Sequence, residues 1–283
     1  MGLKLKPDNA KAGRIDLMSV VRLLTRSNTL SLGMAFAHGL IVMAVIVLAV
    51  LSEYEDGLYD QILENTITLD MDDQQKALAL LHRTHSLLKP RLTLFEGENY
   101  INVRDTYFRS SDVQLIDAKG ACGSHAHVLG RLLQRAGIEI RIAQMKCGNF
   151  WGCHILLDAK INDKWVALDA LYGLAFVSPD GTLASFEEIG DNWDVYRLQV
   201  PNDYELSYAY EDVRYTNWDK IPVLMPVVKT VMSLFVGNDV ETLSVRSYAL
   251  NVYWTYMAIL LGVYFCLIVV TILFVRRRAN RAI

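Results

Sequence analysis

The chain has 283 residues, of which 52% are hydrophobic, 21% charged and 10% aromatic, and its net charge is −3. This composition excludes an intrinsically disordered chain, because disorder requires low hydrophobicity and a high net charge. Four cysteines are also too few for a disulfide-rich scaffold.

The charge is distributed unevenly along the chain. Residues 1–27 hold six basic and two acidic residues, and residues 53–245 hold 17 basic and 29 acidic residues. Residues 246–283 hold five arginines and no acidic residue. Nucleic-acid-binding proteins present a basic face, so the acidic middle leads us to expect no nucleic-acid partner.

The first long apolar run follows a basic N-terminal segment, residues 1–29. It extends from Leu30 to Leu51 without a charged residue, which is long enough for a helix that crosses the hydrocarbon core of a bilayer. A cleaved signal peptide is the alternative, but its apolar core is roughly 7–15 residues long and ends at a small-residue cleavage site, which is missing here. We therefore predict a transmembrane helix over residues 30–52.

An amphipathic helix is predicted from Asp70 to Lys89, with acidic residues at its start and Pro90 ending it. His82 and His85 lie three residues apart on this helix. That spacing allows zinc binding, but a solvated helix face is the commoner explanation for it.

A second helix is predicted from Gly120 to Ala136, with Gly137 in the C-cap position. Cys122 lies at the start of this helix. Helix N-termini present free N–H groups and a partial positive charge, which both stabilise a thiolate. The position therefore suits a nucleophilic cysteine.

Three strand patterns follow the second helix: Glu139–Met145, Cys153–Ile161 and Lys164–Leu168. Asn162 and Asp163 form a two-residue connection between the last two, as in a β-hairpin. A helix followed by consecutive antiparallel strands predicts an α+β fold rather than an α/β fold.

Two residues with catalytic chemistry belong to these strands. His154 lies near the start of the second strand and Asp169 directly follows the third, so the hairpin brings them close together. A cysteine at a helix start, facing a histidine that a carboxylate orients, is the arrangement of covalent acyl chemistry. A metal site formed by Cys122, His125 and His154 is the less favoured alternative.

The C-terminal part contains two further apolar segments. Ile221 to Val236 is interrupted by two prolines and Lys229, so we predict an interfacial or core helix there and not a third crossing. The run over residues 252–275 is uncharged and predicts a second transmembrane helix, followed by a basic tail, residues 276–283.

Basic residues flank both predicted spans on the side of the chain termini. The positive-inside rule therefore predicts that both termini are cytoplasmic and that residues 53–245 form an extracytoplasmic domain. The expected location is the cytoplasmic (inner) membrane, with the domain in the periplasm and the lipid bilayer as a partner.

The residues from Gly120 to Gly173 resemble the bacterial transglutaminase-like domain, a family of the papain-like cysteine superfamily. The shared pattern is a Gly-x-Cys helix start, a leucine-rich helix, a Gly-Ile-x-x-Arg strand entry, a histidine strand and a Trp-x-x-x-Asp strand end. The resemblance implies that Cys122 is the nucleophile, His154 the general base and acid, and Asp169 the residue that orients the imidazole. It implies a papain/transglutaminase-like fold, in which the nucleophile helix packs on an antiparallel sheet, and we expect no cofactor.

The insert between the first two strands holds Cys147, Cys153, Phe150 and Trp151. In an oxidising compartment the two cysteines can form a disulfide that leaves Cys122 free, and two ordinary thiols are the equal alternative. Phe150 and Trp151, at the tip of this insert, are either substrate contacts or packing residues.

These features predict a membrane-anchored cysteine enzyme that acts through a thioester acyl-enzyme. It would transfer or hydrolyse an amide or ester of a peptide, protein or glycan in the cell envelope. The alternative is a non-catalytic transglutaminase-like subunit of a membrane protein complex for envelope or surface-polysaccharide assembly or export. Full function in a Cys122→Ala variant would favour this alternative.

Overall fold

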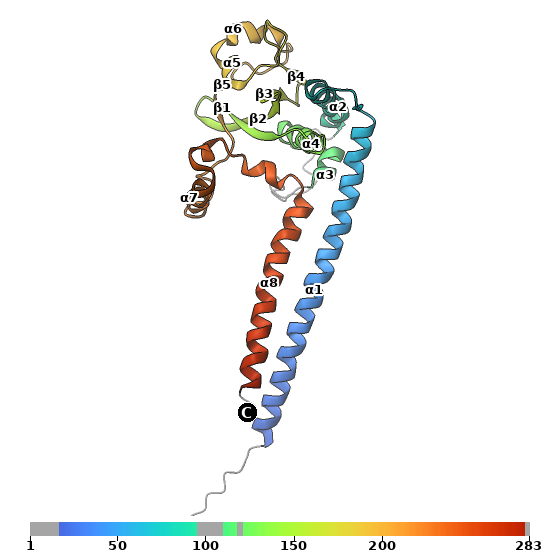
Figure 1. Ribbon diagram of the computed structural model, residues 1–283, viewed down its shortest axis with the longest axis vertical. Coiled ribbons are helices and arrows are strands. Elements are labelled where there is room, and N and C mark those ends of the chain that lie inside the picture. Colours follow the sequence, from blue (N-terminus) through green and yellow to red (C-terminus); the bar gives the residue numbers. More distant parts are fainter. Residues whose placement is uncertain (1–16, 95–109, 118–120, 281–283) are drawn as a thin grey trace, which may run out of the picture. The chain divides into compact units, whose positions relative to one another are not determined.

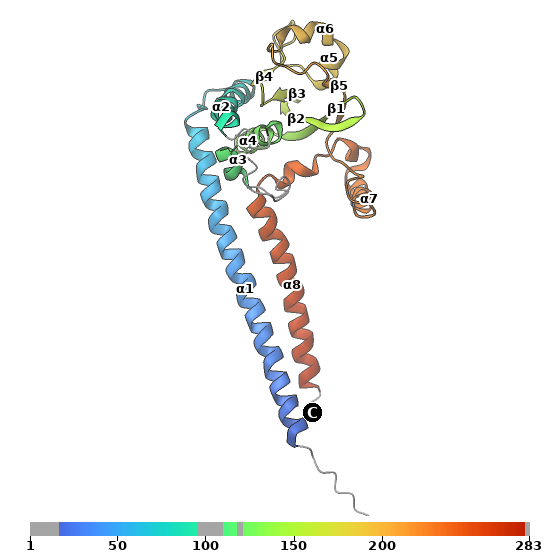
Figure 2. The same ribbon diagram turned by 180° about the vertical axis from the view of Figure 1, so that it is seen from behind.

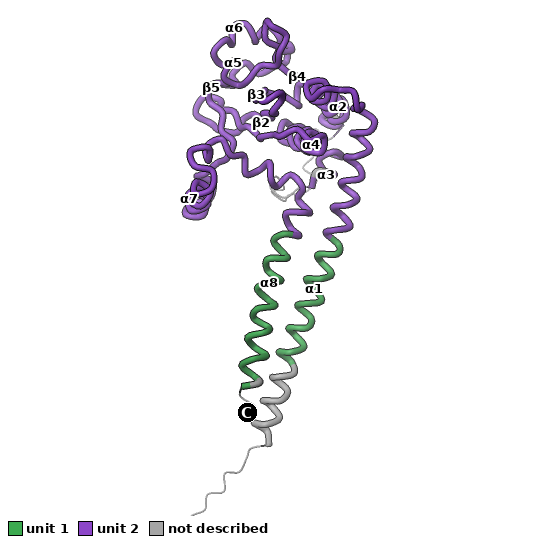
Figure 3. The backbone as a smooth tube through the Cα atoms, in the orientation of Figure 1, with its two compact units in different colours: residues 1–47, 258–283 green, residues 48–257 purple. Residues whose placement is uncertain are grey.

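The computed structural model describes residues 17–94, 110–117 and 121–280, whose elements are labelled in Figure 1. Residues 1–16 of the predicted basic segment, and Gly120 at the predicted start of the second helix, lie outside the described residues. The chain divides into two compact units, residues 1–47 with 258–283, and residues 48–257 (Figure 3).

The first unit consists of parts of two long helices, α1 (Leu17–Glu64) and α8 (Val252–Ala279). Both contain apolar stretches long enough to be candidate membrane spans, with mean hydropathies of 2.6 and 2.9. Within this unit the His38 Nε2 atom of α1 lies 3.0 Å from the Thr271 Oγ1 atom of α8.

The α1 helix continues well past the predicted span, to Glu64, because its last turns belong to the folded second unit. Tyr59 is fully buried there. Asp56 accepts a hydrogen bond from Arg131 at 2.5 Å, and Asp60 accepts one from Arg135 at 2.5 Å. Apolar burial and these ion pairs hold the end of α1 on the domain.

The second unit is built on a five-stranded sheet with the order β4-β3-β2-β1-β5, in which every neighbouring pair is antiparallel. The strands are β1 (Ile140–Cys147), β2 (Phe150–Ile161), β3 (Lys164–Asp169), β4 (Leu174–Ala175) and β5 (Ala209–Arg214). The helices are α2 (Asp73–Leu94), α3 (Ser111–Asp117), α4 (Cys122–Arg135), α5 (Phe186–Asp191), α6 (Trp193–Tyr196) and α7 (Leu224–Val236). The predicted α+β class is confirmed.

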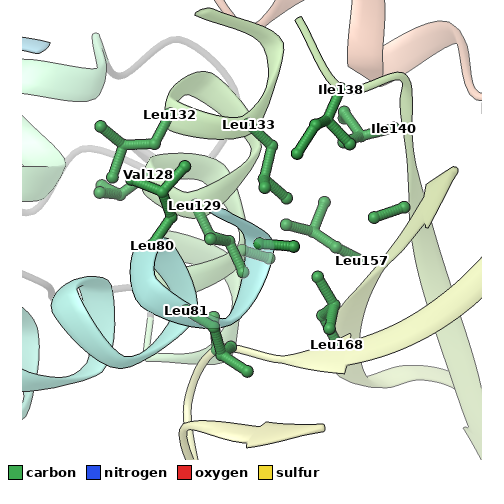
Figure 4. Packing of buried hydrophobic residues seen from close by; sticks show 14 of the residues in the cluster. Leu80, Leu81, Val128, Leu129, Leu132, Leu133, Ile138, Ile140, Leu157 and Leu168 are labelled. Atoms are coloured by element: carbon green, nitrogen blue, oxygen red, sulfur yellow. The ribbon is translucent and has the colours of Figure 1, made fainter. Parts of the chain in front are cut away.

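Helices cover both faces of the sheet, as Figures 1 and 2 show from opposite sides. On one face α2 and α4 bury a core whose packing is drawn in Figure 4. Its fully buried leucines include Leu80, Leu81 and Leu88 of α2, Leu129, Leu132 and Leu133 of α4, Leu157 of β2 and Leu168 of β3. On the other face, α5 and α6 enclose an aromatic core that includes Phe176 and Tyr210.

The predicted hairpin is present in the structure. Asn162 and Asp163 both have positive φ, 50° and 63°, and they connect the paired residues Ile161 and Lys164. Positive φ at both central residues is the requirement of the tight hairpin turn that matches strand twist. The first two strands are longer than predicted, because β1 and β2 keep pairing up to Cys147 opposite Phe150.

The prediction that Pro90 ends the helix expected from Asp70 to Lys89 is wrong, since α2 runs from Asp73 through Pro90 to Leu94. A proline inside a helix removes one backbone donor and costs about 3 kcal/mol, and the packing on either side of it offsets this cost. Leu88 is fully buried and Leu92 packs against the same core.

The predicted interfacial or core helix at Ile221 to Val236 is α7, which spans Leu224–Val236. None of its residues is buried, so the structure excludes the core alternative.

Candidate functional site

Cys122 is the first residue of α4 and is partly exposed. The residue before it, Ala121, has φ +43° and ψ −114°, a conformation that L-residues rarely adopt. The sulfur is thus carried on a tight corner at the helix N-terminus, where free backbone N–H groups lie close to it. Such corners cluster at functional sites.

His125 holds this corner from one turn further along. Its backbone N–H and its Nδ1–H both donate to the Ala121 carbonyl oxygen, at 3.0 and 2.8 Å. Burial lowers the pKa of His125, although its bond to Ala121 opposes the shift. A neutral imidazole therefore anchors the strained residue next to Cys122.

His154 and Asp169 meet at the same end of β2 and β3. His154 Nε2 donates to Asp169 Oδ2 at 2.7 Å, and both side chains are almost completely buried. The antiparallel register, with Leu157 opposite Leu168, brings the two positions together. The structure therefore joins the histidine and the carboxylate that the sequence pattern selected.

Asp169 is itself held by several donors. The backbone N–H groups of Leu171 and Tyr172 donate to its Oδ1 at 3.1 and 3.3 Å, and the Tyr204 hydroxyl donates to Oδ2 at 3.4 Å. With both oxygens engaged, the carboxylate cannot rotate away from His154.

The His154 side chain also interacts with the Cys122 sulfur. Nδ1 is buried and has no fully formed hydrogen bond among the described residues. Burial alone would lower the pKa of His154, but hydrogen bonding and charge from Asp169 and then from the Cys122 thiol raise it to about 9. His154 is therefore a cation through the neutral pH range, placed between a carboxylate and a thiol.

Tyrosines that the sequence analysis did not select surround the pair. The Tyr208 ring stacks on the His154 imidazole with centroids 4.3 Å apart and planes within 6°. Tyr172 meets the same imidazole edge to face at 6.0 Å, and the hydroxyls of Tyr204 and Tyr210 lie 2.5 Å apart. Burial raises the pKa of Tyr204 and Tyr208, so these hydroxyls stay neutral.

A sequence signal for two of these tyrosines existed. Tyr208 directly precedes β5 and Tyr210 is its second residue, so the two are two residues apart, the spacing of one face of a strand. Tyr204 lies in the preceding loop, where no periodicity marks it.

The β1–β2 hairpin carries the remaining predicted residues. Cys147 and Cys153 form a disulfide with Cα atoms 6.1 Å apart, and Cys122 is a free thiol. Phe150 is 69% exposed at the hairpin end. Trp151 packs against cations, with Lys146 Nζ and Arg214 Cζ at 5.5 and 4.7 Å from its ring. A substrate contact by either aromatic residue stays a prediction.

The sequence also allowed two metal sites. Among the described residues, no group of three or more His, Cys, Asp or Glu side chains is arranged to hold a metal ion. The Nδ1 atom of His125 is engaged by the Ala121 carbonyl oxygen. His85 donates through Nδ1 to the Leu171 carbonyl oxygen at 2.8 Å, while His82 is exposed. The two histidines of α2 thus have separate environments.

Comparisons with models of protein families, with curated proteins and with solved structures found no match for this chain.

Proposed function

We propose that this protein is a membrane-anchored, transglutaminase-like cysteine enzyme with a papain-like arrangement of its catalytic residues. Cys122 would be the nucleophile, His154 the proton carrier and Asp169 the residue that orients the imidazole. The observation that carries the proposal is His154 itself, which donates to Asp169 at 2.7 Å and keeps its other nitrogen for Cys122.

The chemistry follows from the protonation state. With His154 as imidazolium, the Cys122 thiolate attacks an amide or ester carbonyl, and the oxyanion that forms is stabilised by N–H groups at the start of α4. His154 then gives its proton to the leaving amine or alcohol as the C–N or C–O bond breaks, and a thioester remains.

In the second half of the proposed reaction, the breakdown of the thioester, the proton moves in the opposite direction. His154, now neutral, accepts a proton from an incoming amine or water that attacks the thioester carbonyl. The C–S bond breaks and the Cys122 thiolate is restored. An amine acceptor gives acyl transfer, and water gives hydrolysis.

The location supports a substrate in the cell envelope. Two candidate membrane spans frame the domain, and basic residues lie beyond both of them towards the termini. By the positive-inside rule this charge pattern favours cytoplasmic termini and a periplasmic domain. A peptide, protein or glycan of the envelope would then be within reach.

The test is the pH dependence of Cys122 alkylation by iodoacetamide, read by mass spectrometry of the peptide that contains it. Wild-type protein is compared with His154→Ala, and with His82→Ala as a control that removes an exposed histidine on α2. We expect fast labelling that persists below pH 7 in the wild type and the control, because His154 is cationic there and a neighbouring cation favours the thiolate.

Labelling in His154→Ala should become slow at neutral pH and rise only in the alkaline range. If the wild type itself labels slowly, with a profile that His154→Ala leaves unchanged, the enzyme proposal is wrong. The non-catalytic assembly subunit would then be the better hypothesis, and the search should turn to protein partners in the membrane.

A further inference from the structure

The α7 helix presents an apolar stripe to the outside of the second unit. Its five members recur at helical spacing and lie within one side of the helix. They are Leu224, Val227, Val231, Leu234 and Phe235, and their exposed fractions lie between 47% and 81%. Continuous apolar exposure of this kind marks a surface that another apolar phase covers.

The other side of α7 is attached to the protein. Lys229 forms a salt bridge of 2.5 Å with Glu241, which belongs to the 3₁₀ helix Gly237–Thr242. Val240 of the same short helix is buried. The helix is therefore anchored by its partly polar side, and its apolar stripe stays available.

We propose that α7 lies in the plane of the membrane surface, with this stripe inserted at the boundary between headgroups and acyl chains. The proposal rests on the membrane anchoring proposed above. The candidate span in α8 begins at Val252, and only residues 237–251 separate it from the end of α7 at Val236. This short connection keeps α7 close to any bilayer that α8 crosses.

The composition of the segment fits an interfacial position. Lys229 is the one charged residue of α7, and the exposed stripe contains none. At 13 residues the helix is about 20 Å long, too short to cross a hydrocarbon core of about 30 Å. A short helix with one apolar side is suited to lie in the interface.

A second copy of the chain is a weaker occupant. A stable protein–protein interface buries about 800 Å² on each partner, and a stripe of five side chains on a helix of 13 residues supplies only part of that. A bilayer needs no such area, because the flanking spans already hold it at a high effective concentration.

The test uses the full chain in phospholipid nanodiscs, with a fluorescent NBD label on single cysteines. Leu234→Cys reports on the stripe, and Ser233→Cys reports on the opposite side of the same helix, each combined with Cys122→Ala and Cys266→Ala. A third sample labels native Cys266, which is exposed within the α8 candidate span, in a Cys122→Ala background. Lipids with a shallow doxyl group serve as the quencher.

We expect blue-shifted emission and several-fold stronger quenching at position 234 than at position 233. Equal, weak quenching at both positions, with Cys266 quenched by deep doxyl lipids, would overturn the α7 proposal and leave the membrane anchoring intact. Absence of quenching at Cys266 would contradict the anchoring itself. A blue shift at 234 without quenching, together with energy transfer between copies, would instead identify a dimer interface and also overturn the proposal.

Discussion

At the scale of single residues, the proposed function depends on where the proton of His154 resides. Burial works against the imidazolium, and only the hydrogen bonds and charges of Asp169 and Cys122 reverse that effect and bring the pKa to about 9. Asp169 accepts its other hydrogen bonds from backbone N–H groups and from Tyr204. The carboxylate is therefore the first source of the raised His154 pKa, and the fold holds it in place by these hydrogen bonds.

Replacing Asp169 with asparagine tests this directly. The amide keeps the size of the side chain but removes the charge, while the burial that lowers the pKa of His154 remains. We expect a neutral imidazole at pH 7 and at least a roughly tenfold slower alkylation of Cys122 at that pH. The thiolate then loses its neighbouring cation, and about 1.4 kcal/mol of lost stabilisation lowers its population tenfold. The rate is measured across pH 5.5 to 9.5.

The control for this variant is Asp163→Asn. Asp163 is an exposed turn residue of the hairpin between β2 and β3, and asparagine tolerates its positive φ. A pH profile in Asp163→Asn that equals that of Asp169→Asn would show that the effect comes from the hairpin in general and not from the charge beside His154.

At the scale of elements, a residue with positive φ lies at each end of α4. Ala121 precedes the helix with φ +43°, and Gly137 follows it with φ +83°. Glycine adopts such angles without a steric penalty, whereas residues with a Cβ pay roughly 1–3 kcal/mol in sparsely populated regions. Gly137 therefore suits the backbone conformation at the C-terminal end of α4, whereas Ala121 is strained at the N-terminal end.

Exchanging the residue types should change stability in opposite directions. Ala121→Gly is expected to stabilise the fold by about 1 kcal/mol, and Gly137→Ala to destabilise it by about the same amount. A Cβ at Gly137 would meet no atom within 4 Å, so its effect comes from the backbone angle alone. Thermal unfolding in detergent measures both.

The Cys122 alkylation rate of Ala121→Gly is the second readout. If the strained corner positions the sulfur, the more stable variant should label more slowly at pH 7. A variant that is more stable and equally reactive would show that the angle at Ala121 has no part in presenting Cys122.

The elements around the site differ in how well the sequence predicts them. The α4 helix, the β2–β3 hairpin and the meeting of His154 with Asp169 follow from local rules, namely a helix stop at Gly137 and two turn residues that fix the strand register. Side chains of hairpin-connected strands are placed by register alone. Prediction therefore works where the partners are close in the chain.

Prediction failed where distant packing decides. Tyr204 contacts Asp169 and Tyr208 stacks on His154. Both tyrosines follow α5 and α6 in the chain, and no local sequence pattern predicts these long-range contacts. β5 was missed for the same reason, since it pairs with β1 across a long connection. For α5, by contrast, the sequence does contain a local signal. Ser185 and Glu188 have the spacing of a capping box, which they form at the start of this helix.

The disulfide of the β1–β2 hairpin is a further prediction at this scale. Cys153 directly precedes His154, so the bond between Cys147 and Cys153 ties the first residues of β2 beside the site. Closing so short a loop stabilises a fold by about 2 kcal/mol in the chain-entropy model. Cys147→Ala with Cys153→Ala should lose that amount in denaturant unfolding, whereas Cys266→Ala should not.

Peptide mapping without reduction checks the compartment at the same time. Protein taken from intact cells in the presence of an alkylating agent should show the Cys147–Cys153 cross-link and an alkylated Cys122. Free thiols at positions 147 and 153 would contradict a periplasmic domain, because that compartment oxidises such pairs.

At the scale of the whole molecule, two buried histidines should limit the pH range of stability from opposite sides. His127 donates through Nε2 to the Leu250 carbonyl oxygen at 3.0 Å, and burial, helped by the charge of Arg246, lowers its pKa to about 3. His154 has its pKa raised to about 9 by Asp169 and Cys122 in spite of burial. The ordinary value for both is 6.5.

The direction of each effect follows from which state binds the proton. Below pH 6.5 the unfolded chain protonates His127 and the folded chain does not, so stability falls as the pH is lowered towards 3. Above pH 6.5 the unfolded chain loses the His154 proton and the folded chain keeps it. In a Cys122→Ala background, where the cysteine adds no proton of its own to the balance, stability therefore falls as the pH rises above 6.5. Each histidine by itself contributes about 1.4 kcal/mol per pH unit within its range.

Unfolding of the full-length Cys122→Ala chain in detergent, followed from pH 4.5 to 9.5, should therefore show a loss of stability on the acid side that depends on His127 and a loss on the alkaline side that depends on His154. His127→Gln, which can still donate to Leu250, should flatten the acid side and leave the alkaline side unchanged. His154→Gln should flatten the alkaline side only. His82→Ala, which removes a solvent-exposed histidine, should change neither, and an acid side that persists in His127→Gln would assign the acid sensitivity to other groups.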